Sequence, residues 1–201
     1  PHVPLLGIIS RLNDSKGFDI LGEVIDHVLD LGVQIVLMGT GEQHYHDLFS
    51  RMVEQYPQQV AIFLTFNTPL GQRIYAGSDM FLMPSRVEPC GTNQLVALRY
   101  GSVPIVRATG GLADTVQDYN PRTGQGNGFV FHSYDRWKLF AAVVRAVETY
   151  KHRDAWQQLQ KRGMAADHSW HQSAIRYVDL YRRAIASRIP RAGLEKYQVQ
   201  A

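Results

Sequence analysis

Short apolar runs alternate with amphipathic segments along most of the chain, the pattern of an α/β domain with a parallel sheet. The apolar runs predict buried strands over residues 5–9, 33–38, 60–64, 80–83, 103–106 and 128–131. Apolar residues at helical spacing predict helices over residues 17–32, 44–56, 70–76 and 92–100, and a helical region from Tyr134 onward. This alternation predicts right-handed crossovers with helices on both faces of the sheet.

Two segments depart from this alternation. Residues 121–127 are rich in glycine, proline and polar side chains, which favours an exposed loop inside the domain over a linker between domains. Periodicity is lost towards the C-terminus, where Pro190 and Gly193 occur. The sequence therefore predicts one domain over residues 1–185 and a flexible tail over residues 186–201.

Composition narrows the class of protein. With 45% hydrophobic and 19% charged residues, the chain can bury a core. The net charge of +3 is mild, and no basic run indicates nucleic acid or a membrane surface as a partner. No signal peptide or apolar stretch of about 18 residues occurs, so we expect a soluble fragment of a longer protein. The single cysteine, Cys90, fits a reducing compartment, either the cytoplasm or the plastid stroma.

Candidate chemistry lies in three loops that follow predicted strands, because ligands bind at the carboxyl ends of parallel strands. Residues 10–17 carry Arg11 and Lys16, and residues 84–94 carry Glu88 and lead into a helix. The third loop contains residues 109–111, Thr-Gly-Gly. Two cations and a helix N-terminus together suit a pyrophosphate.

Each of these features also has a simpler interpretation. Arg11 and Lys16 taken singly resemble solvated loop charges, and Gly91 resembles an ordinary turn residue. Glu88 can equally be a structural carboxylate that caps a helix or pairs with Arg86. The Gly39-Thr40-Gly41 segment lacks the third glycine of a dinucleotide fingerprint, which favours a tight turn.

The motifs in these loops resemble glycogen and starch synthases, and the resemblance extends to about residue 184. The residues that carry it, in order, are Ser10-Arg11-Leu12, Lys16-Gly17, Ala76-Gly77-Ser78-Asp79, Pro84-Ser85, Glu88-Pro89-Cys90-Gly91, Asn93-Gln94, Arg99-Tyr100-Gly101, Thr109-Gly110-Gly111-Leu112, Asp114-Thr115-Val116, Asp167-His168-Ser169-Trp170, Tyr177 and Leu180-Tyr181.

This resemblance implies the C-terminal, donor-binding domain of a two-domain GT-B glycosyltransferase with a Rossmann-like sheet. On this resemblance we expect the acceptor-binding N-terminal domain to be missing from this chain and the isolated chain to be inactive. The implied reaction is retaining transfer of glucose from ADP-glucose to the non-reducing end of an α-1,4-glucan, without a cofactor or a metal. Front-face attack, with the leaving phosphate assisting deprotonation of the acceptor, is the implied mechanism.

The resemblance also implies a role for individual residues. Arg11 and Lys16 would bind the donor diphosphate and stabilise the leaving ADP. Glu88 falls on the active-site glutamate, and Phe66 on the aromatic residue against adenine. Further donor-binding residues are Cys90, Gly91, Thr92, Asn93, Thr109 and Gly110.

Departures from the family pattern leave alternatives open. Val96 stands where the broader retaining group often has a second acid, and Thr92 replaces a leucine. Asn67-Thr68 replace a more polar or acidic pair that the family places beside the nucleotide base of the donor. The alternatives are another retaining GT-B transferase that uses a UDP-sugar, and a non-catalytic domain that binds nucleotide or glucan.

Other conspicuous side chains predict packing. We expect no metal site from the histidines, because His44 and His46 diverge on a helix. Trp170 and two tyrosines at helical spacing, Tyr177 and Tyr181, indicate core or interdomain packing. Cys90 is predicted to be a small packed residue near the site.

Overall fold

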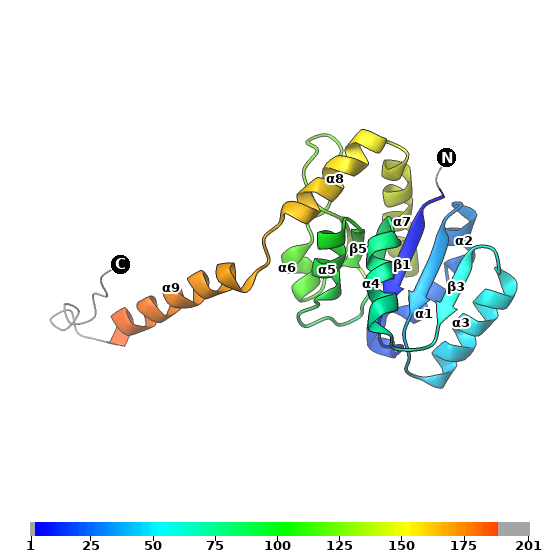
Figure 1. Ribbon diagram of the computed structural model, residues 1–201, viewed down its shortest axis with the longest axis horizontal. Helices are drawn as coiled ribbons and strands as arrows, with labels where there is room; N and C mark the ends of the chain where they lie inside the picture. Colours follow the sequence, from blue (N-terminus) through cyan, green and yellow to red (C-terminus); the bar gives the residue numbers. More distant parts are fainter. Residues whose placement is uncertain (1–2, 189–201) are drawn as a thin grey trace. The chain divides into compact units, whose positions relative to one another are not determined.

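Six parallel strands form one sheet in the order β3-β2-β1-β4-β5-β6 in the computed structural model, which describes residues 3–188 (Figure 1). Every pairing of neighbouring strands is parallel. The predicted α/β fold is therefore confirmed, and the order reverses between β1 and β4. The strands are β1 (Leu5–Ile9), β2 (Gln34–Met38), β3 (Val60–Phe63), β4 (Met80–Met83), β5 (Val103–Arg107) and β6 (Phe129–Phe131).

The helices follow the predicted alternation, with two differences. The helix predicted over residues 17–32 is broken at Val24, which leaves the helical region at φ −123° and ψ 8° and is itself buried. A five-residue helix, α6, follows β5 where none was predicted. The helices are η1 (Asp14–Lys16, a 3₁₀ turn), α1 (Phe18–Gly22), α2 (Ile25–Asp30), α3 (Gln43–Gln55), α4 (Thr68–Gly77), α5 (Asn93–Tyr100), α6 (Gly111–Thr115), α7 (Arg136–Tyr150), α8 (Arg153–Ala165) and α9 (Trp170–Arg188).

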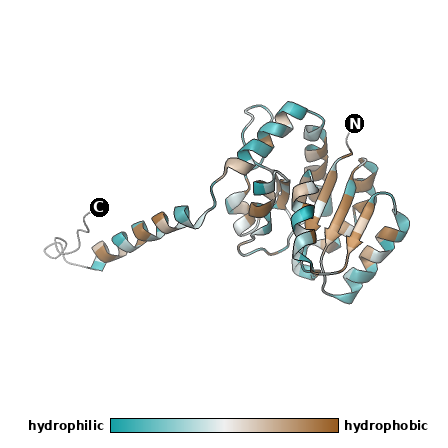
Figure 2. Ribbon diagram, viewed as in Figure 1, coloured by the Kyte–Doolittle hydropathy of each residue, from teal (hydrophilic) through white to brown (hydrophobic). Residues whose placement is uncertain are grey.

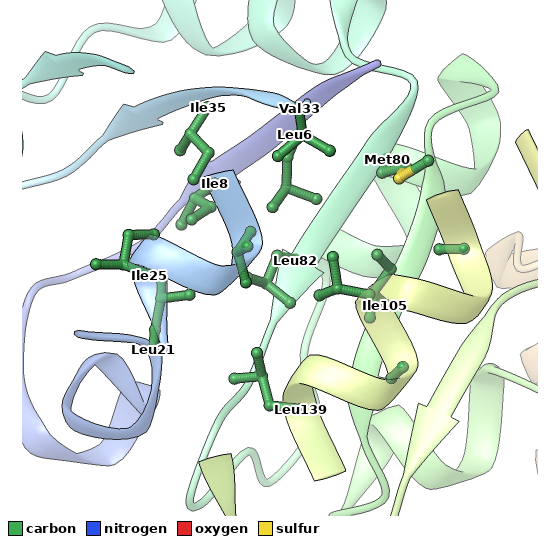
Figure 3. Packing of buried hydrophobic residues seen from close by; sticks show 14 of the residues in the cluster. Leu6, Ile8, Leu21, Ile25, Val33, Ile35, Met80, Leu82, Ile105 and Leu139 are labelled. Atoms are coloured by element: carbon green, nitrogen blue, oxygen red, sulfur yellow. The ribbon is translucent and has the colours of Figure 1, made fainter. Parts of the chain in front are cut away.

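Helices cover both faces of the sheet, which explains why each strand is a nearly continuous run of apolar residues. In β4, Met80 and Leu82 point into the larger core, which includes Leu21 of α1 and Leu139 of α7 (Figure 3). Phe81 and Met83 join a second cluster with residues of α4, α5 and α6. Alternation along a strand sends successive side chains to opposite faces. Figure 2 accordingly shows the central strands in brown, the colour of hydrophobic residues.

A single side chain caps the longest helix of the sheet domain. Asp135 precedes α7, and its carboxylate accepts hydrogen bonds from the amides of Trp137 at 2.9 Å and Lys138 at 3.0 Å. Asp135→Ala leaves both amides without this acceptor and is expected to lower the free energy of unfolding by about 1 kcal/mol. Urea unfolding measures the loss. The control is Asp154→Ala, which removes an acid from the first turn of α8 and should cost only a few tenths of a kcal/mol. Equal losses of stability in the two variants would mean that Asp135 does not act as a cap.

The chain divides after Ala166 into two units. The first contains the sheet and the helices up to α8, and the described part of the second contains α9. The predicted boundary at residue 185 falls inside α9, and residues 189–201 of the predicted tail lie outside the described residues. Residues 121–127 form turns that return to β6 in the same sheet, as expected of a loop inside the domain.

Within the described residues, helix α9 buries none of its side chains. The prediction of core packing is therefore wrong for this helix, while the alternative of interdomain packing stays a prediction. Trp170, Tyr177 and Tyr181 are 83%, 53% and 60% exposed, so these aromatic residues are not part of a core in the described residues. Helical spacing alone marks an apolar face without identifying what covers it. Within residues 3–188, no helix is both long enough and apolar enough to cross a membrane.

Candidate functional site

A cavity of about 370 Å³ opens at the carboxyl ends of the central strands, between the loops that follow β1 and β4. This is the point where the strand order reverses, the usual ligand position in such a sheet. The loops after β2 and β3 contribute Gly39, Thr40 and Thr65. The predicted site residues that line the cavity are Arg11, Lys16, Phe66, Glu88, Gly91, Thr92 and Asn93.

Two of these residues form an ion pair across the cavity wall. Lys16 Nζ lies 2.7 Å from Glu88 Oε2, and the two side chains are 20% and 11% exposed. Ser85 Oγ donates to the same carboxylate oxygen at 3.1 Å. Partial burial makes such a pair stronger than an exposed one, because solvent screens it less. The alternative pairing of Glu88 with Arg86 is wrong: the Arg86 guanidinium turns away to Asp19, at 2.8 Å.

Main-chain contacts place Lys16 beside the loop of Glu88. The amides of Arg86 and Val87 donate to the Ser15 carbonyl oxygen at 2.9 and 3.2 Å. Gly17 follows Lys16 in the chain and has φ +77°. It packs so closely against the loop after β4 (the β4 loop) that a Cβ atom at Gly17 would lie 2.1 Å from the Pro84 carbonyl oxygen. The two loops are thus held together independently of the ion pair.

Arg11 and Phe66 lie at the open side of the cavity. Arg11 is exposed, and its guanidinium makes no hydrogen bond or ion pair with any described residue. Phe66 is 81% exposed, an unusual environment for a phenyl ring. Both side chains are therefore accessible to a ligand, one as a cation and the other as an aromatic surface.

The start of α5 forms a third wall. Thr92, the N-cap, makes no side-chain hydrogen bond to the helix, so the first amides of α5 keep their capacity to bind an anion. Gly91 stands at φ +68°, a conformation that favours glycine. The Asn93 side-chain amide donates to the Ile9 carbonyl at 2.8 Å and ties α5 to the end of β1. The buried Gln94 donates to the Gly91 carbonyl at 3.0 Å.

Three predicted site residues do not line the cavity. Thr109 and Gly110 lie behind the β4 loop, where the Gly111 amide contacts the carbonyls of Glu88 and Pro89, both at 3.2 Å. Cys90 is exposed, so its interpretation as a small packed residue is wrong. The backbone of Cys90 makes the close contact instead, because its carbonyl oxygen lies against Gly111.

Sequence reasoning missed a polar cluster behind the β4 loop. Arg107 donates to the Ser85 carbonyl at 2.8 Å, and Tyr134 donates to Asp19. Burial favours a higher pKa for Asp19, but hydrogen bonds from Tyr134, the Ile20 amide and Arg86 outweigh it and hold that pKa below its ordinary value. Arg107 could have been noticed because it ends a strand at the edge where ligands bind.

Asp14, Glu42 and His44 form an exposed group whose ligand atoms all lie within 4.8 Å of one another. The two ring nitrogens of His44 each lie 3.7 Å from one of the carboxylates. His46 turns away, and its Nε2 accepts from the Gly41 amide at 3.1 Å. Exposed acidic groups are common without an ion, so the expected absence of a metal stays a prediction.

Known proteins resemble the chain in both sequence and fold. The family described as Glycosyl transferases group 1 matches residues 2–163. Glycogen synthases from Desulforudis audaxviator and Fervidobacterium nodosum are each 52% identical to the chain, over 91% and 90% of its length. The chain spans only 37% and 38% of those two proteins.

A solved structure matches the whole fold. The catalytic domain of starch synthase IV from Arabidopsis thaliana, bound to ADP and acarbose, aligns with a TM-score of 0.83 at 38% sequence identity. The alignment covers 92% of this chain and 39% of that protein. The α/β fold of the chain therefore matches part of a glycosyltransferase catalytic domain.

Proposed function

The chain belongs to the group 1 glycosyltransferases, and on that premise we propose that it is the C-terminal, donor-binding domain of a glycogen or starch synthase. The proposed reaction is retaining transfer of glucose from ADP-glucose to the non-reducing end of an α-1,4-glucan. One observation carries the proposal: Lys16, Glu88 and the start of α5 meet in one cavity at the reversal point of the sheet. The 52% identity to glycogen synthases supports the choice of reaction.

The cavity offers a separate group to each part of the donor. Lys16, Arg11 and the first amides of α5 would bind the diphosphate, because all three favour an anion. Phe66 would stack on the adenine, since its ring is free at the cavity rim. As the bond from glucose to phosphate breaks, negative charge grows on ADP and these groups stabilise it. This arrangement requires no cofactor or metal.

Glu88 would act at the glucose end of the donor. Its carboxylate lies at the cavity wall, where it can accept hydrogen bonds from sugar hydroxyls and stabilise positive charge at the anomeric carbon. The acceptor hydroxyl would attack on the face that ADP leaves, and a phosphate oxygen would take its proton. Lys16 donates to the Glu88 carboxylate at 2.7 Å and so fixes its position at the cavity wall.

The proposal requires a second domain for the glucan acceptor. The relatives are more than twice as long as the chain, and a domain closing over the donor would exclude water and prevent hydrolysis. We expect the chain alone to bind nucleotide without transferring glucose. The bacterial relatives favour the cytoplasm over the plastid stroma as the compartment.

Calorimetric titration of the chain with ADP, UDP and NAD tests the donor site. We expect selective binding of ADP, and Lys16→Ala should weaken it by about 1.5–3 kcal/mol because a charged hydrogen bond to the diphosphate is lost. Lys151→Ala is the matched control. Lys151 also pairs with a glutamate, Glu148 at 2.6 Å, but at the C-terminal end of α7, where both side chains are more than half exposed.

Other outcomes of the titration would select among the alternatives. Preference for UDP would favour another retaining transferase that uses a UDP-sugar. Absence of binding to all three nucleotides would contradict a preformed donor site and favour a non-catalytic domain. An equal loss in the Lys16 and Lys151 variants would mean that the diphosphate is attracted by net charge alone.

A further inference from the structure

Arg107, the last residue of β5, uses its guanidinium group to join two loops. Its Nε donates to the Ser85 carbonyl at 2.8 Å, and its Nη2 donates to the Arg86 carbonyl. Its Nη1 donates to the His132 carbonyl, beyond β6, at 3.3 Å. No carboxylate among the described residues pairs with this cation. Arg107 therefore acts on the backbone of its neighbours and does not line the cavity.

Tyr134 forms the centre of the same cluster. The guanidinium carbons of Arg86 and Arg107 lie 4.6 and 5.6 Å from the centroid of its ring. Its hydroxyl donates to Asp19 of α1, which also pairs with Arg86 at 2.8 Å. Cation–π contacts and charged hydrogen bonds thus tie the β4 loop to α1 and to the loop after β6.

A short path of contacts leads from Arg107 to the ion pair. The Ser85 carbonyl accepts from Arg107, while the Ser85 hydroxyl donates to Glu88. The next residue, Arg86, accepts from Arg107 through its carbonyl and donates through its amide to the loop of Lys16. A shift of the backbone at residues 85–86 would move Glu88 and its contact with Lys16 together.

We propose that Arg107 is a positioning residue that holds the β4 loop so that Glu88 and Lys16 meet at the donor site. The inference rests on the proposed function only for what Lys16 and Glu88 do at the donor site. The geometry of the pair does not depend on that function. Arginine suits the position because its planar group offers several donors in a fixed fork, whereas lysine is a single point charge. A positioning residue acts without touching donor or acceptor.

The decisive experiment is a double-mutant cycle on urea unfolding of the 201-residue chain. Lys16→Met, Glu88→Gln and the double variant are compared first with Arg107 present and then in Arg107→Met. With Arg107 present, we expect non-additivity of about fivefold in the unfolding equilibrium constant, as for residues in direct contact. In Arg107→Met this coupling should disappear. If Arg107→Met only reduced stability, it would lower the free energy of unfolding equally in the parent chain, the two single variants and the double variant.

Two outcomes overturn the inference: coupling that persists unchanged in Arg107→Met, or no coupling with Arg107 present. If Arg107→Met fails to fold, Arg107→Lys replaces it, because lysine retains the charge but donates from a single nitrogen and should leave reduced coupling. No nucleotide enters this experiment. Failure of the proposed function therefore cannot be mistaken for failure of the positioning role.

ADP titration supplies the functional counterpart. Arg107→Met should weaken ADP binding by about tenfold. Loss of the Glu88 contact alone would free Lys16, but the β4 loop leads into the first amides of α5, and small displacements of such binding groups have large effects. Arg107→Lys should restore part of the affinity. Arg145→Met is the matched control: Arg145 donates to Asp118 and to the Val130 carbonyl, a comparable tether away from the cavity. Wild-type chain that fails to bind ADP counts against the proposed function, while equal losses in the Arg107 and Arg145 variants count against positioning.

Discussion

Glu88→Gln in the complete transferase is expected to slow glucose transfer about 100-fold while ADP binds at least as tightly as before. The loss in turnover reflects the carboxylate charge, which would stabilise the developing positive charge at the sugar. The affinity for ADP should not fall, because Lys16 donates to Glu88 at 2.7 Å. A diphosphate must compete for that donor, and a neutral glutamine competes less strongly than a carboxylate.

Steady-state kinetics and ADP titration together measure this separation of turnover from affinity. Glu148→Gln is the control, because Glu148 also pairs with a lysine, Lys151, on an exposed face where both side chains are more than half exposed. It should leave both quantities unchanged. Equal weakening of ADP binding and turnover by Glu88→Gln would mean that Glu88 supports the donor site as a whole, and the proposed role at the glucose end would be wrong.

Gly111→Ala is expected to lower the free energy of unfolding by about 3 kcal/mol or more and to remove ADP binding. A Cβ atom at this position would lie 1.6 Å from the Cys90 carbonyl oxygen. Because that neighbour is backbone, relief requires movement of the β4 loop, with loss of the Gly111 amide contacts to the carbonyls of Glu88 and Pro89. A clash this short should lower the free energy of unfolding by more than an added methyl group in a core usually does. Urea unfolding and ADP titration measure the two effects.

Gly77→Ala provides the contrasting control within the same domain. Gly77 ends α4, and nothing lies within 4 Å of a Cβ atom placed there. Alanine restricts the unfolded chain and favours the helix, so this variant should be neutral or up to about 1 kcal/mol more stable. If Gly111→Ala is as harmless as Gly77→Ala, the contact between the β4 and β5 loops does not hold the site.

The location of the site followed from sequence because it depends on strand ends. Lys16 and Glu88 each fall a few residues after a predicted strand, and parallel strands bring such loops to one edge. Their order and spacing also resemble glycogen and starch synthases. The position of Arg107 at the end of a strand marks the ligand-binding edge, but it does not identify the carbonyl groups that the guanidinium binds. Tyr134, an aromatic residue just before a helix, carries no such signal.

The sequence by itself determined the strands, their parallel direction and the edge at which the site forms, because local periodicity and short loops leave few other arrangements. Only the tertiary structure decided which groups meet there. Lys16 pairs with a glutamate 72 residues away, and Tyr134 reaches Asp19 across 115 residues. The exposure of Cys90 was likewise a tertiary outcome. Contacts between segments so far apart depend on how whole loops pack, and no local pattern of residues encodes that packing.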